Sequence, residues 1–498
     1  GDDMEYKYKR WQLFGKRLNV PKNILNDVYN SRLSCADFFK YKLDDKIPLS
    51  CLWPYDKKII DKFGIDKCKN LDWELIGRRY ISELMSIDSK TKDLNRALCE
   101  ILKDKIIPAQ YSLKMKELYP NRIIDINQDD NENIEVIATY DNEMPQEIKN
   151  IYNPKHKGEG VNYFDYVFVT ARSANLREKP DPKSKVIGKF TYDVKLKLLE
   201  KVRYQGNIWY LVEDTKGNKG YIAGSQTKKR DFRFQMALDK IGDLEYFINK
   251  SIDEGATLMS VNTYAPNPSN INPQREKDKY GTSLDQNLLG ISKKGERIII
   301  PDRSIVKIIE NRGDKALVRA LSIPEEVEVS KAKLSAYPSI KKGFRKVIAI
   351  DIENQNFMVF EKSKQTNEWE LISYVYTKTG IDSQLGYETP KGFFTVPVVK
   401  YVMPYTDETG QKQGSAKFAI RFCGGGYLHG TPINVQEEAN KEFFLRQKEF
   451  TLGTTTGTRK CVRTSEGHAK FLFDWLVYSP NKDSNEQRLS EDAYFIVF

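Results

Sequence analysis

YLHGTP at residues 427–432 and TRKCVR at residues 458–463 hold one of the three histidines and one of the six cysteines of this 498-residue chain. A thiol attacks a carbonyl carbon as the thiolate, so it needs a nearby base or positively charged surroundings. His429 can supply the base for Cys461. A simpler interpretation also fits, because a free cysteine in a folded domain is most often a small buried side chain. Catalysis by this pair is therefore a hypothesis that the surrounding sequence has to support.

The sequence around Cys461 favours a reactive thiol. Its positively charged neighbours are Arg459, Lys460 and Arg463. Because positive charge stabilises a thiolate, we expect the pKa of the Cys461 thiol to lie below its ordinary value of about 8.5. A glycine run at residues 424–426 can leave backbone N–H groups free to face a substrate. After the thiol, Thr464 and Ser465 precede apolar residues at helical spacing, which predicts that a helix begins there.

The order of these motifs resembles the catalytic domain of the L,D-transpeptidases of the YkuD type, which act on the bacterial cell wall. In that family a His-Gly or His-Ser pair precedes a Ser/Thr-His-Gly-Cys-(Val/Ile/Leu)-(Arg/Asn) segment. The matching residues here are His429, Gly430, Thr458, Cys461, Val462 and Arg463. Arg459 stands where the family usually has histidine, and Lys460 where it usually has glycine. Upstream segments IDIENQNFMVF, TKTG and ETPKGFFTV are similar too, so the resemblance covers roughly residues 344–498.

The resemblance implies a cysteine acyltransferase that acts on peptidoglycan stem peptides. Cys461 would attack the carbonyl of the bond between an L-centre and a D-residue, and His429 would move the proton to the departing D-amino acid. The Gly430 carbonyl would orient the imidazole. The expected substrate-binding residues are Arg463, Arg459, Tyr427, Gly425 and Thr458. Transfer to an amine would form a cross-link, transfer to water would make the enzyme an L,D-carboxypeptidase, and neither reaction needs a cofactor or a metal ion.

Two other functions remain open from the sequence. Arg459 stays charged and cannot exchange protons as histidine does, so an inactive cell-wall-binding protein is one alternative. A cysteine endopeptidase that acts on cell-wall peptides is the other. In that class the nucleophilic cysteine precedes its histidine by a long stretch, whereas only His468 follows Cys461 and the chain soon ends. The order of the residues therefore argues against the endopeptidase, and we read His468 as structural.

Residues 164–224 alternate short apolar stretches with turn signals, which is typical of a small β-barrel. The stretches NLREKPDPKSKVIGKF, WYLVE and GNKGYIAG, in this order, resemble a bacterial SH3 domain. We expect a closed barrel with Trp209 packed inside it. Such domains bind cell-wall peptide or dock onto a neighbouring catalytic domain, and a plain spacer is the alternative.

The sequence predicts a multidomain chain. We expect a mainly helical region at 1–160, an SH3-like domain at 161–226, and a helix, a loop and a second, diverged SH3-like segment at 227–343. Residues 344–498 would form a mainly β domain similar to the L,D-transpeptidase catalytic domain. The chain shows no signal peptide, so we expect a mature form from the bacterial envelope, in the periplasm and anchored by a lipid.

Composition narrows the partners. The net charge of +11 is spread along the chain without a basic arm or stripe, which argues against nucleic acid as a partner. No apolar run reaches the roughly 18 residues of a transmembrane helix, and we expect a monomer. Four cysteines in the first hundred residues allow three disulfide pairings, and the sequence does not choose among them. These are Cys35, Cys51, Cys68 and Cys99. We expect Cys423 and Cys461 to be free thiols.

Overall fold

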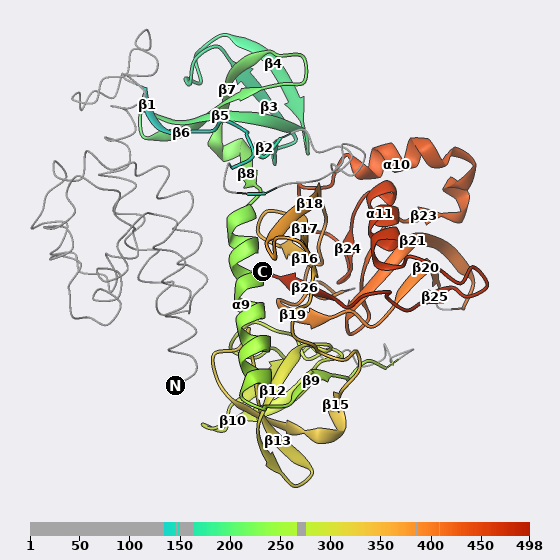
Figure 1. The fold of residues 1–498 in the computed structure, drawn as a ribbon. Coiled ribbons are helices and arrows are strands. Elements are labelled where there is room, and N and C mark those ends of the chain that lie inside the picture. The colour runs from blue at the N-terminus through green and yellow to red at the C-terminus, as the bar shows by residue number, and fades with distance from the viewer. Residues whose placement is uncertain (1–133, 146–147, 150–162, 266–274, 385, 408) are drawn as a thin grey trace, which may run out of the picture. The chain divides into compact units, whose positions relative to one another are not determined.

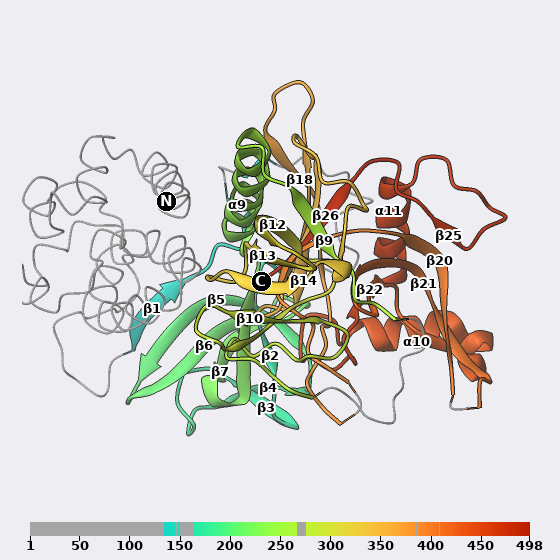
Figure 2. The ribbon, with the colours of Figure 1, turned by 90° about the horizontal axis from the view of Figure 1, so that it is seen from below.

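The computed structural model describes residues 134–145, 148–149, 163–265, 275–384, 386–407 and 409–498. Residues 1–133 of the predicted helical region, with its four cysteines, lie outside these residues, and the described part of the region contains a strand at Glu135–Thr139. The chain divides into two compact units, with residues 163–231 in the first and residues 232–498 in the second. Each unit is described by itself. Figures 1 and 2 show that strands dominate both units.

The first unit is one eight-stranded sheet with the order β4-β3-β7-β6-β5-β2-β8, and β1 pairs with β5. Its strands are β1 (Glu135–Thr139), β2 (Asp165–Val169), β3 (Ser173–Arg177), β4 (Val186–Thr191), β5 (Lys195–Tyr204), β6 (Asn207–Glu213), β7 (Lys219–Ala223) and β8 (Thr227–Asp231). The predicted closed barrel is wrong. A barrel needs its two edge strands to pair, but β8 pairs with β2 and β4 pairs with β3, so the sheet stays open within the described residues.

Trp209 is buried, but not in the main core of this sheet. Tyr210 and Val212 of β6 face the main core, and alternation along the strand turns Trp209 to the opposite face. There it packs with Val136 of β1 and Val202 of β5 and is 6% exposed. The strand β1, which lies outside the SH3-like stretch, therefore provides part of the cover for this tryptophan.

The second unit begins with helix α9 (Phe234–Asp253) and a seven-stranded sheet of order β11-β10-β14-β13-β12-β9-β15. The strands are β9 (Leu258–Val261), β10 (Leu288–Ser292), β11 (Arg297–Ile300), β12 (Ile305–Arg312), β13 (Lys315–Ala320), β14 (Val327–Ser330) and β15 (Leu334–Ser335). Alternating apolar residues of these strands form one core around Ile298, Val306 and Val318. The helix was predicted, the strands β9, β10 and β15 were not, and the SH3-like character of this sheet stays a prediction.

The C-terminal part contains two sheets around one core. A five-stranded sheet has the order β18-β17-β16-β26-β19, and a six-stranded sheet has the order β24-β22-β21-β20-β25 with β23 on β21. The first comprises β16 (Lys346–Asp351), β17 (Asn356–Lys362), β18 (Trp369–Tyr376), β19 (Gly392–Thr395) and β26 (Ala493–Val497). The second comprises β20 (Val399–Thr406), β21 (Lys412–Cys423), β22 (Gly426–His429), β23 (Ile433–Asn434), β24 (Val462–Arg463) and β25 (Glu486–Gln487). Mainly β architecture is thus confirmed for the described residues.

Two helices complete this part. The helix predicted after Cys461 is α11 (Glu466–Leu476), and its N-cap Ser465 accepts a hydrogen bond from the His468 backbone N–H at 3.2 Å. Leu472, Phe473 and Leu476 of α11 join the core shared with β21 and β22. The loop after His429 carries α10 (Lys441–Glu449). No described helix is long and apolar enough to span a bilayer.

Candidate active site

A parallel pair of strands brings the two motif segments together. Strand β22 pairs with β24, so that Leu428 lies opposite Val462 and His429 lies opposite Arg463. Leu428 and Val462 belong to the buried core. Because side chains alternate along a strand, the residues before and after them face the other side of the sheet. This register places His429 beside Arg463, and Cys461 comes directly before β24, although 428 and 462 are far apart in the chain.

His429 is held in one orientation. Its side chain is 3% exposed, and Nδ1 lies 2.7 Å from the Gly430 carbonyl oxygen. Burial lowers the pKa of His429 to about 4, although the hydrogen bond to Gly430 opposes the shift and the nearby Arg463 adds to it. The imidazole is therefore neutral at ordinary pH. The space at Gly430 is tight, because an added Cβ would lie 3.1 Å from the Glu466 Cα and would require its neighbours to shift slightly.

Cys461 is a free, partly buried thiol. Its Sγ donates weakly to the Gly425 carbonyl at 3.9 Å, and Gly425 turns the chain at φ +72°, a conformation that favours glycine. Burial raises the pKa of Cys461, while a hydrogen bond from the Tyr427 backbone and the charges of Lys460 and Arg463 lower it. The predicted depression of this pKa is wrong in direction, because removal of water from around the thiol outweighs the two positive charges.

The residues from Thr458 to Lys460 have different structural roles. The Thr458 hydroxyl donates to the Cys461 carbonyl oxygen and so fixes the segment that carries the thiol. The Arg459 side chain is exposed and is not among the groups that act on the Cys461 thiol. Lys460 is buried, and its ammonium pairs with Asp285 at 2.5 Å. The sequence pattern gave no sign of this pair, since Asp285 is 175 positions away.

Two further residues of the expected binding set lie beside the thiol. The Tyr427 ring is buried, with the Lys400 ammonium 5.1 Å from its centroid, and the Tyr427 backbone faces Cys461. Burial lowers the pKa of Arg463, while Tyr405 and Cys461 oppose that shift. Among the described residues, Arg463 has no ion-pair partner. A carboxylate of a bound ligand could take that place.

Tyr405 is a residue that sequence reasoning missed. Its hydroxyl is buried and has no hydrogen-bond partner among the described residues. Burial raises the pKa of Tyr405 to about 12, and the ionisable groups that act on it are Arg463, Cys461 and Glu437. An unpartnered buried hydroxyl is unusual. Only a structure could have revealed it, because nothing in the sequence separates Tyr405 from the other tyrosines.

The remaining candidates are structural. Cys423 is fully buried and free, and burial raises its pKa to about 12. His468 lies inside α11 with Nε2 2.7 Å from the Ser373 hydroxyl, a role in the core that agrees with the structural interpretation. The described residues contain no cluster of three or more side chains suited to a metal ion.

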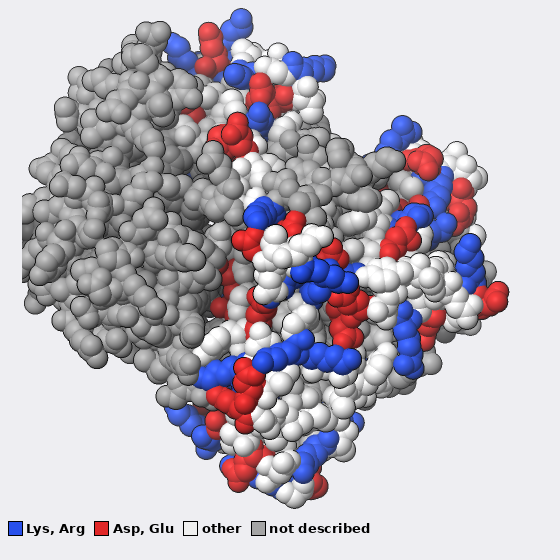
Figure 3. Space-filling model, viewed as in Figure 1, with Lys and Arg blue, Asp and Glu red and all other residues white. Residues whose placement is uncertain are grey.

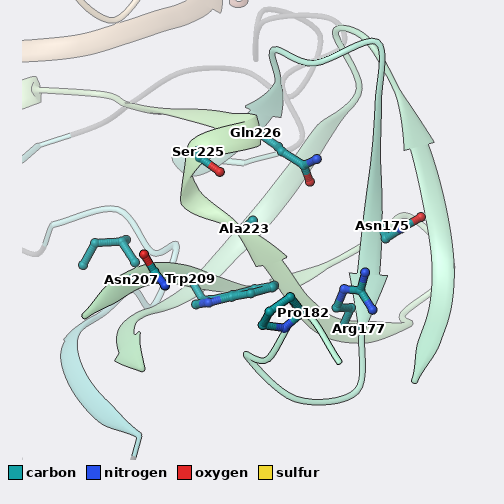
Figure 4. Close-up of a pocket in the computed structure, with 9 residues that line it drawn as sticks. Asn175, Arg177, Pro182, Asn207, Trp209, Ala223, Ser225 and Gln226 are labelled. Carbon is teal, nitrogen blue, oxygen red and sulfur yellow. The ribbon is translucent and has the colours of Figure 1, made fainter. Parts of the chain in front are cut away.

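The first unit contains a separate pocket of about 390 Å³. Figure 4 shows Trp209 and Pro182 side by side in its wall, with Arg177 next to Pro182. The polar side chains that line it are Asn175, Arg177, Asn207, Ser225 and Gln226. Of these, only Arg177 makes a side-chain hydrogen bond within the described residues, to the Ser184 carbonyl oxygen at 2.8 Å. Its lining carries one positive and no negative charge.

The geometry defines a class of site: a thiol and a neutral imidazole on neighbouring segments, each affected by the charge of Arg463. Comparison with known families agrees. Residues 345–481 match the L,D-transpeptidase catalytic domain, and residues 172–227 match the bacterial SH3 domain. Both resemblances expected from the sequence are confirmed.

Solved structures give weaker similarities. The L,D-transpeptidase from Mycobacterium smegmatis is 14% identical, with 49% of this chain and 91% of that chain covered and a TM-score of 0.22. L,D-transpeptidase 3 from Mycobacterium tuberculosis is 14% identical, with 45% of this chain and 81% of that chain covered and a TM-score of 0.21. A fused amidase, peptidase and peptidoglycan-binding protein from Clostridium acetobutylicum is 15% identical, with 31% of this chain covered and a TM-score of 0.20. This chain spans only 52% of that protein. No curated protein matches the chain.

Proposed function

We propose that residues 344–498 act as a peptidoglycan L,D-transpeptidase with Cys461 as nucleophile and His429 as base. The observation that carries the proposal is the register of β22 and β24, which brings the strand of His429 next to the segment that Cys461 precedes. The hydrogen bond from Nδ1 to Gly430 leaves Nε2 of His429 as the proton acceptor. The matched catalytic domain supports the same assignment.

The chemistry proceeds in two halves. As Cys461 Sγ bonds to the carbonyl carbon of the stem peptide, its proton passes to His429 Nε2. The C–N bond then breaks, and the departing D-amino acid takes that proton on its nitrogen. In the second half an amine of another stem attacks the thioester, the C–S bond breaks, and the amine proton returns to the thiol. Water in place of the amine gives a carboxypeptidase.

The raised pKa of Cys461 and the lowered pKa of His429 describe a pair that is neutral at rest. Proton transfer therefore accompanies the attack instead of preceding it. Backbone N–H groups near Cys461 would stabilise the oxyanion. Arg463, which has no ion-pair partner among the described residues, would bind the stem carboxylate. Thr458 would hold the nucleophile segment, and Tyr427 and Gly425 would line the thiol. Because Arg459 is exposed, it would contact substrate only at the outer edge of the site.

The proposed setting is the outer side of the bacterial cytoplasmic membrane, at the cell wall, which both matched domains support. A periplasmic location, a lipid anchor and a monomeric state are further parts of the proposal. Figure 3 shows Lys and Arg intermixed with Asp and Glu on the drawn face of the described residues. Such a surface suits recognition of a ligand in a defined site more than general attraction to a polyanion.

A mass spectrum of the protein after incubation with a carbapenem tests the proposal. We expect one covalent adduct, located on the Cys461 peptide, and none in Cys461→Ala with an unchanged circular dichroism spectrum. His429→Ala should lose most of the turnover of a stem tetrapeptide. No adduct, together with binding to isolated cell wall, would instead support the inactive wall-binding protein. Cleavage of stem peptides at another bond would support the endopeptidase.

The pocket of the first unit favours a second, binding function. A pocket of this size with an aromatic wall and convergent polar groups is typical of ligand sites. The Arg177 guanidinium is its only charge, so an anionic ligand is expected, and the surrounding amides suit a peptide backbone. We propose that this pocket binds a wall peptide through a free carboxylate.

A further inference from the structure

The backbone at Lys460 takes a conformation that ordinarily belongs to glycine. Its φ is +151°, in the region where side chains of L-residues are strained. Close packing enforces this conformation. A Cβ added at Gly380 would lie 2.6 Å from the Lys460 Cα, and the Thr389 hydroxyl donates to the Lys460 carbonyl at 2.7 Å. The segment before Cys461 is therefore fixed against its surroundings, as expected of strain retained at a functional site.

The side chain of Lys460 is buried, with 7% of it exposed. Its ammonium pairs with Asp285 Oδ2 at 2.5 Å and also donates to the Gly424 carbonyl oxygen. A buried charge is costly unless it is paired and hydrogen-bonded, and both conditions are met here. Asp285 lies just before β10, in a connection that reaches the glycine run, since an added Cβ on Gly424 would lie 3.1 Å from Gln286.

The ammonium thus ties three segments around the Cys461 sulfur. Lys460 is the residue before the nucleophile, and Gly424 begins the turn whose Gly425 carbonyl accepts from the thiol. The same turn leads to Tyr427, whose backbone faces the thiol. Loss of the ammonium would release the turn from the nucleophile segment and remove a positive charge from beside the sulfur.

Few other charges surround this thiol. The titratable and charged groups around it are Lys460 and Arg463 on its own segment, His429 and Tyr427 on β22, Cys423 on β21 and Tyr405 on β20. At pH 7–9 the imidazole, the second thiol and the phenols are neutral. Lys460 and Arg463 are therefore the two charges that favour the Cys461 thiolate.

We propose that Lys460, anchored by Asp285, is a positioning residue for Cys461 that both fixes the thiol in the turn and favours its thiolate form. This inference rests on the acyl-transfer function proposed above and adds a residue that positions its nucleophile. Its test reads the chemistry of the thiol directly, so a failure of the transferase proposal and a failure of this one remain distinguishable.

The test measures the rate of Cys461 alkylation by iodoacetamide from pH 6 to 11 in the full chain, read by mass at the Cys461 peptide. Lys460→Met keeps the length of the side chain and removes its charge. We expect its alkylation curve to move to higher pH by about one unit, which is about a tenfold slower reaction at pH 7. Lys460→Gly, which tolerates the positive φ, should give the same shift if the Met variant folds poorly.

The Asp285→Asn variant separates the anchor from the charge. It leaves the ammonium without its carboxylate, so we expect the alkylation curve to move to lower pH. Asp285 is not among the groups that act directly on the thiol, so this shift should vanish in the Lys460→Met background. Lys346→Met is the matched control, since Lys346 is a buried lysine of the same domain held by the Trp475 carbonyl and the Tyr478 hydroxyl. It should leave the curve in place.

Two results in the site variants and one in the control variant would overturn the proposal. One is a Lys460→Met curve that superimposes on that of the unmodified protein while the variant remains folded. The other is an Asp285→Asn shift that persists unchanged in the Lys460→Met background. A shift in Lys346→Met of the same size would show that any buried charge in the domain has this effect, which also contradicts a specific role for Lys460.

Discussion

His429 Nδ1 lies 2.7 Å from the carbonyl oxygen of Gly430, the next residue in the chain. A carbonyl oxygen only accepts hydrogen bonds, so Nδ1 carries the proton and Nε2 presents a lone pair. The backbone of Gly430 is fixed in turn, because its N–H donates to the Lys417 carbonyl at 2.9 Å. The tautomer of the proposed base is therefore set by the backbone of β22 and β21 and not by a carboxylate.

This arrangement predicts the pH profile of Cys461 acylation by a carbapenem. Because the pKa of His429 is about 4, the base is available at every pH above that value. We expect a rate that changes little between pH 5.5 and 8 in the unmodified protein. In His429→Gln the rate should follow the thiolate fraction and rise about tenfold per pH unit. The check is a single-turnover rate from intact mass. A tenfold rise per pH unit in both proteins would mean that His429 is not the base.

His429 also predicts how stability changes with pH. The unfolded chain takes up a proton on this residue near pH 6.5, while the folded protein does so only near pH 4. Between these values the unfolded state binds more protons, so the free energy of unfolding falls as the pH falls. The loss attributable to His429 is about 3 kcal/mol at pH 4 relative to pH 7. Urea unfolding at pH 4 and pH 7 should show that the free energy of unfolding falls less on acidification in His429→Asn than in the unmodified protein. An equal loss in the two proteins would contradict the prediction.

The sequence predicted the elements of this site better than its electrostatics. The helix after Cys461 follows from a local pattern of a cap and apolar residues at helical spacing, whereas the strand that carries His429 was not predicted. The pKa of Cys461 was predicted in the wrong direction, because burial depends on packing that the count of neighbouring arginines and lysines does not reveal. The open edge of the first sheet was missed for a similar reason, since pairing of β8 with β2 is a long-range contact.

Removal of the Tyr405 hydroxyl should slow acylation without lowering the free energy of unfolding. The group is buried without a partner, so Tyr405→Phe should leave the free energy of unfolding unchanged or raise it by about 1 kcal/mol. If bound substrate satisfies this hydroxyl, acylation of Cys461 should slow by about tenfold. Tyr494→Phe is the control. Tyr494 is a buried tyrosine of β26 whose pKa is affected by Asp492 and not by Cys461. Equal acylation rates in Tyr405→Phe and the unmodified protein would remove Tyr405 from the site.

Arg459 and Arg463 should differ in their effect on the thiol. The Arg463 charge favours the Cys461 thiolate, whereas Arg459 is exposed and its charge is screened by water and salt. We expect Arg463→Gln to move the alkylation curve of Cys461 to higher pH and Arg459→Gln to leave it in place. The alkylation rate of Cys461, measured against pH in the two variants, checks this prediction. A shift in Arg459→Gln would show that this arginine replaces the histidine usual in the family.

The pocket of the first unit predicts a preference for a free carboxylate. Trp209 lines it, and its indole N–H reports on a bound ligand by NMR, with the resonance assigned through Trp209→Phe. A stem peptide that ends in D-alanine should bind more tightly as the free acid than as the amide. Arg177→Gln should weaken binding of the acid by about tenfold or more, because a charge-assisted hydrogen bond is lost. Arg172→Gln removes the same charge from an exposed position outside the pocket and should leave the affinity unchanged. Equal affinity of the unmodified protein for the acid and the amide would mean that Arg177 does not recognise a carboxylate.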